Sequence, residues 1–259
     1  MIDAFRPNRV ISNRAWTIIL GVQLGALFFA WTFGSAFLIP NPLDVLNAWF
    51  RLVKEEGLLY ELGVSMKTNA EALGISSVLS IGLAYLTVLP VMRPIAQFIS
   101  KSRFFGMSGF VVIFTMAFGG GHALKVSLLV FAMSVFFITS MATVVSEIPR
   151  EKFDHARSLR MGEWRIVLEV VIFGKADQAF EALRQNAAIG WMMLTVVEGL
   201  VRSEGGIGAL MLNQAKYMRL DSVFAAQLTV LAIGVLQDQF LVWVKNVFCP
   251  HARLTLERR

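Results

Sequence analysis

Residues 123–145 read ALKVSLLVFAMSVFFITSMATVV, an apolar run with a single charged residue, Lys125. A helix needs roughly 20 predominantly apolar residues to cross the hydrocarbon core of a bilayer. A run of this length and composition therefore predicts a membrane-spanning helix. It indicates that the fold is organised around helices in a membrane rather than around a water-soluble core.

Five further apolar stretches accompany this run. They lie at about residues 15–38, 70–89, 105–118, 180–201 and 223–244. The stretch at 105–118 is short and lies beside Gly119, Gly120 and Gly121, so it is either a full span that begins near Ile95 or an interrupted one. Together these stretches predict an all-α transmembrane fold with about six membrane-spanning helices.

The composition supports a single membrane domain over residues 1–259. Hydrophobic residues make up 56% of the chain and charged residues 16%, whereas soluble domains carry about 25% charged residues. The N-terminal arginines precede an apolar run, as in a signal peptide, but that run is too long for one and no small-residue cleavage site follows it. The one cysteine, Cys249, excludes an internal disulfide and a multi-cysteine metal site.

An amphipathic helix is expected between the first two spans. Residues 42–53 carry apolar side chains at three- and four-residue spacing with charged residues between them. Such a helix of about three turns suits the membrane surface, and Pro42 suits its first turn.

Basic residues follow the alternation of the spans. With the N-terminus inside, the inside segments hold 16 Lys and Arg residues and the outside segments hold 6. Because Lys and Arg collect on the cytoplasmic side of membrane proteins, both termini are expected there. The cytoplasmic parts are then residues 1–14, the loop at 146–178 and the tail at 245–259. A nucleic-acid partner is excluded, because the basic residues follow the membrane faces and form no single patch.

No catalytic or metal-binding constellation is visible in the sequence. A phosphate-binding G-x-x-x-x-G-K-[ST] loop is missing, so the chain is not expected to hydrolyse ATP itself. His122, His155 and His251 are far apart and are expected to be solvated loop residues without a metal. Cys249 is expected to be inert.

The most informative segment is the polar loop between the fourth and fifth spans. Residues 147–165 read EIPREKFDHARSLRMGEWR. Phe153, Ala156 and Leu159 share one face of a short predicted helix, where they would pack in a partner's groove or on the rest of the loop. Gly162 is expected to end the helix and to let the chain turn sharply there. The segment is either an ordinary solvated loop or a docking element, and its length and amphipathic pattern favour docking.

A family resemblance supports the docking interpretation. Asp154-His155-Ala156, with Gly162 six residues after Ala156, resembles the E-A-A…G loop of binding-protein-dependent ABC importer permeases. Residues 156–165, 190–200 and 204–208 are similar to the nitrate/sulfonate/taurine-type subfamily, and Ile39-Pro40-Asn41-Pro42 resembles its L-P-S-P segment. The resemblance implies a type I importer permease fold. It also implies a cytoplasmic coupling helix that seats in an ATPase subunit through Asp154, His155, Ala156, Arg157, Leu159 and Gly162.

The sequence also departs from the family pattern. Asp154-His155 stands where the family has Glu-Ala, and Arg160 stands where it often has Gly. These differences bear on the substrate and on the partner ATPase rather than on the fold.

One face of the fifth span carries the candidate pathway residues. Arg184, Trp191, Thr195 and Glu198 recur there at three- and four-residue steps. Ionisable residues are costly in lipid, so they usually face a cavity or a partner. The alternative is that Arg184 and Arg202 snorkel at the two ends of the span and Glu198 pairs near the outer surface. Asn69 and Glu71, at the expected start of the second span, pose the same choice.

The sequence and the resemblance together predict a permease of the bacterial inner membrane. As the resemblance implies, it would pair with a second copy and bind two ABC ATPase subunits, which would hold ATP and Mg²⁺. An extracytoplasmic binding protein would deliver a small anion such as a sulfonate, nitrate or taurine. The chain itself would need no cofactor and would contact membrane lipid. An ion-coupled secondary transporter and a membrane-embedded enzyme are the alternatives. Neither the buried mid-membrane carboxylate of the former nor the clustered catalytic groups of the latter is evident.

Overall fold

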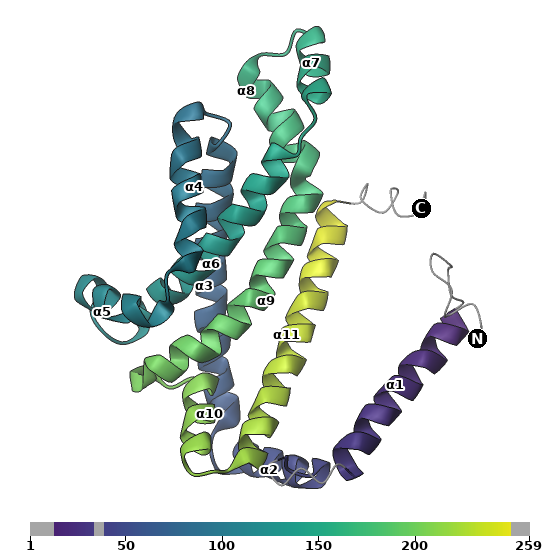
Figure 1. The fold of residues 1–259 in the computed structure, drawn as a ribbon, viewed down its shortest axis with the longest axis vertical. Coiled ribbons are helices and arrows are strands. Elements are labelled where there is room, and N and C mark those ends of the chain that lie inside the picture. Colours follow the sequence, from purple (N-terminus) through teal and green to yellow (C-terminus); the bar gives the residue numbers. More distant parts are fainter. Residues whose placement is uncertain (1–12, 34–38, 250–259) are drawn as a thin grey trace.

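The computed structural model describes residues 13–33 and 39–249, and these residues form helices without a β-strand. The helices are α1 (Asn13–Phe33), α2 (Pro42–Lys54), α3 (Leu58–Leu86), α4 (Arg93–Lys101), α5 (Met107–Phe118), α6 (His122–Ser146), α7 (Arg150–Ser158), α8 (Glu163–Ile166), α9 (Ala176–Leu200), α10 (Ile207–Lys216) and α11 (Leu220–Phe248). A π-helical turn, Val167–Ile172, and a 3-10 turn, Phe173–Lys175, join α8 to α9. Long helices run side by side, with α7 and α8 at one end and α2 and α10 at the other (Figure 1). We call these the α7 end and the α2 end.

Four helices within the described residues are long and apolar enough to cross a membrane. They are α1, through its window Ala15–Thr32, and α3, α6 and α11. At 12 residues, α5 is about 18 Å long, which is less than the roughly 30 Å of a hydrocarbon core. Helix α9 has 25 residues but carries Asp177, Glu181, Arg184 and Glu198. The predicted all-helical, apolar fold is therefore confirmed, and the number of six spans stays a prediction.

The second span begins earlier than its apolar pattern predicted. Helix α3 starts at Leu58 rather than near residue 70, so Asn69 and Glu71 lie within the helix and not at its start. The first three turns escaped prediction because they contain Glu61, Lys67 and several hydroxyl groups. Bundle contacts bury part of this polar set, including Ser65, which is fully buried.

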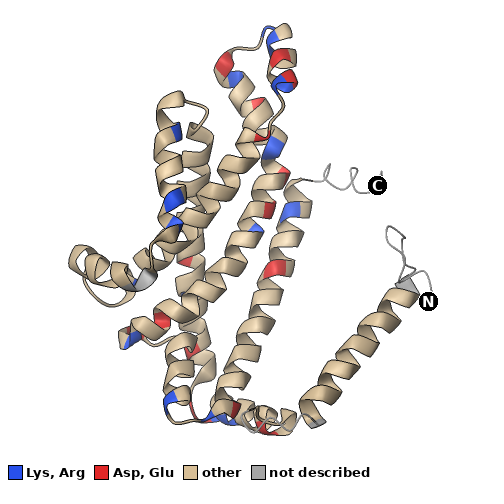
Figure 2. Ribbon diagram, in the orientation of Figure 1, with Lys and Arg blue, Asp and Glu red and all other residues tan. Residues whose placement is uncertain are grey.

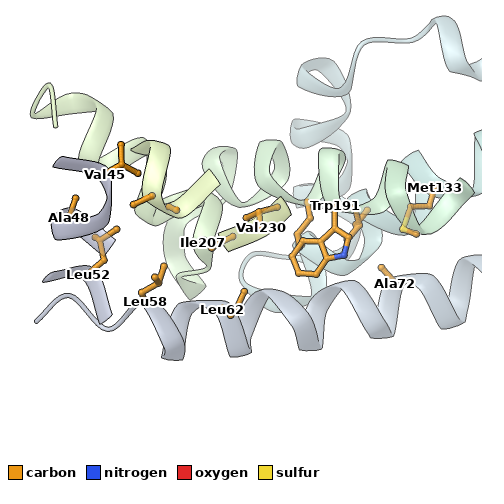
Figure 3. Packing of buried hydrophobic residues seen from close by; sticks show 14 residues of the cluster. Val45, Ala48, Leu52, Leu58, Leu62, Ala72, Met133, Trp191, Ile207 and Val230 are labelled. Carbon is orange, nitrogen blue, oxygen red and sulfur yellow. The ribbon is translucent and has the colours of Figure 1, made fainter. Parts of the chain in front are cut away.

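The largest buried cluster extends from the α2 end to about the middle of α3. Figure 3 shows Leu58, Leu62 and Ala72 of α3 facing Trp191, Met133 and Val230 of the neighbouring helices. Small residues on α3 let α6 and α9 approach closely. At Gly190 of α9, an added Cβ would lie 2.9 Å from Asn69 Oδ1 and 2.8 Å from Met133 Cε. This close packing fixes the position of α9, which carries most of the candidate pathway residues.

The predicted amphipathic helix forms α2 and packs partly on protein. Val45, Ala48 and Leu52 are buried, and Trp49 Nε1 donates a hydrogen bond to Thr229 Oγ1 of α11 at 3.1 Å. Leu43, Leu46 and Phe50 remain exposed. The helix therefore uses one apolar face to close the α2 end and offers another to its surroundings.

Helix α1 lies apart from the other long helices (Figure 1), and no residue of its apolar window is buried. Trp31 Nε1 donates a hydrogen bond to the Pro40 carbonyl oxygen at 3.0 Å, beside the start of α2. Several sequence predictions lie outside the described residues. They concern residues 1–12 of the N-terminal segment, residues 34–38 of the first span, and residues 250–259 of the tail, which include His251.

Candidate functional site

The candidate coupling loop folds as α7 at one end of the molecule. Charged side chains gather on α7 and α8 (Figure 2). Ala156 is buried, as its place on the apolar face predicted, whereas Asp154, His155 and Arg157 are exposed. Leu159 is 58% exposed and borders a hollow of about 420 Å³ between α7 and the π-helical turn. The helix thus has one residue fixed inward and a largely free outer surface.

The prediction that Gly162 ends this helix is wrong. Helix α7 ends at Ser158, and the left-handed residue is Arg160, at φ 56°. The amide of Met161 donates to the Ala156 carbonyl oxygen at 3.3 Å, the six-to-one hydrogen bond of a Schellman motif. Gly162 instead precedes α8 with φ −66°, and an added Cβ would meet no atom within 4 Å. The sharp turn occurs two residues before the glycine because the helix ends earlier than its pattern predicted.

An ion pair holds α7 and α8 together across this turn. Arg157 donates from Nε to Glu163 Oε1 at 2.9 Å and from a terminal nitrogen to Oε2 at 3.2 Å. Its other terminal nitrogen lies 3.4 Å from Asp154 Oδ1. The hydrogen bond to Glu163 raises the pKa of Arg157, and the same bond lowers the pKa of Glu163. Both groups face solvent, so the pair orients the loop more than it stabilises the fold.

Three of the four candidate pathway residues line a hollow between α9 and α11. Arg184, Trp191 and Thr195 border a cavity of about 420 Å³ together with Gln237 and Asp238 of α11. Trp191 Nε1 donates to Gln237 Oε1 at 2.7 Å, and Asn69 Nδ2 of α3 donates to the same oxygen at 3.1 Å. The hollow therefore has a polar wall set inside an apolar helix pair.

Arg184 sits at the polar end of this hollow and is fully paired. It donates to Glu181 Oε1 at 2.6 Å and to both oxygens of Asp238 at 3.1 Å. Lys245 Nζ lies 3.0 Å from the other oxygen of Glu181. Two cations and two carboxylates thus link α9 to α11. This arrangement differs from the expected alternative in which Arg184 snorkels alone to the membrane surface.

Glu198 lies away from this hollow and is completely buried. Its carboxylate accepts hydrogen bonds from Ser65 Oγ at 2.7 Å and from the Gly208 amide at 2.9 Å. Ser65 Oγ in turn accepts from the Ile207 amide at 2.8 Å, and Glu61 accepts from the Gly206 amide. These amides belong to the start of α10, where backbone N–H groups lack helical partners. Side chains of α3 and α9 therefore cap α10 in place of a local capping residue.

Two glycines make this cap possible. Gly205 and Gly206 have φ of 70° and 105°, which glycine adopts without strain. A Cβ at Gly205 would lie within 3.2 Å of the Glu61 carboxyl carbon, and one at Gly206 would overlap the Glu198 carboxylate. The buried Lys125 completes the cluster by donating to the Gly205 carbonyl oxygen at 2.5 Å. The turn from α9 to α10 is thus fixed by charged groups on three helices.

Sequence patterns do not reveal several of these groups. Lys125 falls among the outside basic residues by position, and Ser65, Gln237 and Asp238 carry no separate signal. The helical stripe groups Glu198 with Arg184, but the structure turns the Glu198 side chain towards α3 and α10. The glycine-rich segment at 205–208 was the sequence feature that could have pointed to this cluster. Paired glycines close to a carboxylate indicate that the backbone and the carboxylate lie in close contact.

The histidines and the cysteine occupy unrelated places. His122 starts α6, and its Nε2 lies 2.6 Å from Glu71 Oε2, so it is paired rather than simply solvated. His155 is exposed on α7. Cys249 is buried and unbridged. Within the described residues, no group of three or more His, Cys, Asp or Glu side chains is arranged to hold a metal.

Comparison with known proteins identifies relatives over most of the chain. The nitrate import permease protein NrtB of Synechococcus elongatus is 23% identical over 286 aligned residues, which cover 98% of this chain and 100% of NrtB. The bicarbonate transport system permease protein CmpB of the same species is 22% identical over 198 residues, 74% of this chain and 70% of CmpB. The chain resembles ABC importer permeases. No family model matches it.

The resemblance to ABC importer permeases agrees with the helical fold. Relatives of this class are transport permeases, which suggests a subunit without catalysis. NrtB is matched over its whole length, so the similarity includes both the coupling-loop segment and α9. The transmembrane, transport-related character predicted from the sequence is confirmed at this level.

Proposed function

We propose that the chain is the membrane-spanning permease of an ATP-driven importer for a small anion. Two of its relatives are named as a nitrate and a bicarbonate permease, and both solutes are small oxyanions. ATP and Mg²⁺ would be bound by partner ABC ATPase subunits. An extracytoplasmic binding protein would deliver the anion at the α2 end.

The observation that carries the proposal is the placement of α7. This helix joins α6 to the segment leading into α9, and it stands at one end of the bundle with its outer surface free (Figure 1). Movement imposed on α7 would reach the helix that lines the hollow through α8 and the π-helical and 3-10 turns that follow it. Asp154, His155, Arg157 and Leu159 are available there for an ATPase contact, with Ala156 anchoring the helix.

The translocation pathway would follow the hollow between α9 and α11. Arg184, Trp191 and Thr195 line it, and apolar residues at its rim, including Met192 and Leu231, are exposed. A second copy of the chain packed against this rim would enclose the hollow. The anion would meet Arg184 by competing with the carboxylates that now pair with it, while Glu198 would hold the outer turn in place.

The topology follows from the same arrangement. With the α7 end in the cytoplasm, the loop at 146–178 would lie on the side where Lys and Arg collect, and both termini are expected there from the distribution of basic residues. Helix α9 would supply the fifth span and α5 a partial third span in a bacterial inner membrane. Residues 1–259 would then form one permease domain.

Assembly with the ATPase tests this function directly. In a complex purified with its own ATPase and binding protein, Leu159→Asp should abolish ATPase association and transport, because a charge would be buried without a partner at the interface. Tyr217→Asp is the matched control for ATPase association, since Tyr217 is also exposed but lies at the opposite end. Normal assembly and transport by Leu159→Asp would refute the role of α7. Gradient-driven uptake by the isolated chain would instead favour a secondary transporter.

A further inference from the structure

A large cleft at the α7 end shares Asp154 and Arg157 with the proposed ATPase contact, but the rest of its lining has no role in the transport scheme. It has a volume of about 1180 Å³ and lies between α4, the end of α6 and the α7–α8 segment. Ligand sites in proteins commonly measure about 300–1,000 Å³, so the cleft could hold a substantial headgroup together with water. Its lining includes neutral hydroxyl and amide groups from Gln97, Ser100, Thr139 and Thr143.

The charged lining of this cleft is strongly unbalanced. Five cationic side chains border it, namely Arg93, Lys101, Arg103, Arg150 and Arg157, against the carboxylates of Asp154 and Glu163. Both carboxylates are engaged by Arg157. The other four cations have no carboxylate partner among the described residues. An anionic ligand would therefore find several free cations in one place.

Apolar side chains next to these cations identify the kind of anion. Phe98 is 70% exposed and Phe104 is 80% exposed, and both lie on the segment that contributes Lys101 and Arg103. Arg103 lies over the Phe104 ring, with its guanidinium carbon 5.1 Å from the ring centre. A soluble anion or an acidic protein surface supplies no apolar group that would contact these exposed aromatic rings. A phospholipid matches both features, because it carries a charged headgroup and acyl chains together.

We propose that this basic cleft binds the headgroup of an anionic phospholipid from the leaflet at the α7 end. Phosphate oxygens would accept from Lys101, Arg103 and Arg150, and the acyl chains would run along α4 beside Phe98. Basic pockets between membrane helices on the cytoplasmic side bind anionic headgroups by the same chemistry. Because Arg150 begins α7, the lipid would contact the same helix that is proposed to couple to the ATPase. The lipid site itself requires only that the chain lies in a bilayer.

Lipid binding can be measured on the full chain, purified in detergent and titrated with phosphatidylglycerol or phosphatidylcholine while bound lipid is counted by native mass spectrometry. The variant Lys101→Gln/Arg103→Gln should bind phosphatidylglycerol about 30-fold more weakly, about 5-fold for each lost cation. The matched control Arg202→Gln/Lys216→Gln removes two exposed cations on the segment around α10 and should bind normally. Lys101→Arg/Arg103→Lys keeps both charges and should retain binding.

Competition and stability measurements separate headgroup recognition from binding by charge alone or by acyl chains alone. Inorganic phosphate should not displace phosphatidylglycerol at equal concentration, because it lacks the acyl contacts. Equal binding of the two lipids, unchanged binding by Lys101→Gln/Arg103→Gln, or efficient displacement by phosphate would each overturn the proposal. Both altered side chains are exposed, so the thermal unfolding midpoint of the variant should stay unchanged. If ATPase assembly fails in other variants while this selectivity persists, only the transport proposal is lost.

Discussion

Replacing Ser65 by alanine tests whether the charged cap of α10 holds the turn from α9 to α10. Ser65 Oγ–H donates to Glu198, and the same oxygen accepts from the Ile207 amide. Ser65→Ala removes both bonds between helices and leaves a buried N–H group without an acceptor. A hydrogen bond to a charged group contributes about 1.5–3 kcal/mol and a neutral one about 0.5–1.5 kcal/mol. The expected loss of unfolding free energy is therefore about 2–4 kcal/mol.

Ser76→Ala is the matched control on the same helix. Ser76 is as completely buried as Ser65, but its hydroxyl donates only within α3, to the Leu73 carbonyl oxygen at 3.2 Å. That carbonyl keeps its helical hydrogen bond when the hydroxyl is lost, and alanine favours the helix. We expect a change below about 0.5 kcal/mol, since no contact between helices disappears.

Reversible unfolding of the purified chain in mixed detergent micelles would measure both variants. Amide hydrogen exchange at residues 206–210 should also accelerate in Ser65→Ala and not in Ser76→Ala. Hydrogen bonds between helices in bilayers average about 0.6 kcal/mol. Two bonds of this average strength would contribute only about 1 kcal/mol, which is less than the loss of about 2–4 kcal/mol expected for Ser65→Ala. Equal changes in the two variants would refute the cap as the element that fixes the turn.

Two further substitutions test backbone contacts. Gly208→Ala should lower the free energy of unfolding by about 1–3 kcal/mol or more, because the added Cβ would lie 2.8 Å from the Cα of Thr195 in α9. Gly199→Ala is the control and should be tolerated, because the nearest atom to its Cβ would lie at an ordinary 3.6 Å. Thermal unfolding of the two variants compares them. Arg160→Gly should stabilise the α7–α8 turn by about 1 kcal/mol, because glycine adopts the left-handed conformation that costs an L-residue about 1–2 kcal/mol. Slower proteolysis of the loop in Arg160→Gly would support this, and faster proteolysis would contradict it.

Apolar length alone predicted much of the fold. The stretches at 123–145 and 223–244 correspond to α6 and α11 within a few residues, because both helices are apolar around most of their circumference. The same signal failed for α3, where Glu61 and Ser65 interrupt the hydropathy. These side chains are satisfied by α10, more than 140 positions later in the chain. A local sequence pattern does not show that a polar residue will form a hydrogen bond with a residue far away in the sequence.

The candidate site was likewise predicted only in part from the sequence. Helical spacing put Arg184 and Trp191 on one face, and both border the hollow between α9 and α11; that this hollow is a pathway stays a prediction. Glu198 does not border it, because a shared stripe does not specify which neighbouring helix each side chain contacts. Gly162 was misassigned because the sequence offered one glycine near the end of a helix, while the backbone put the left-handed residue at Arg160. The resemblance to the family contained the missing signal, as position 160 is often glycine there.

The positions of these contacts bear on how α9 would transmit movement in the proposed importer. Near its α10 end, α9 is held by Glu198 to α3 and α10, and nearer the α7 end it is held by Arg184 to Asp238 of α11. Both anchors lie on one continuous helix of 25 residues, so α9 is expected to move as a rod. The π-helical turn at 167–172 precedes it, and such turns are frequent at functional sites. A push on α7 would therefore be absorbed at this turn or passed to Arg184 before it reached the Glu198 cap. Weakening the ion pair between Arg184 and Asp238 should loosen the α7 side of the hollow while the turn from α9 to α10 stays closed, because the two anchors share no residue.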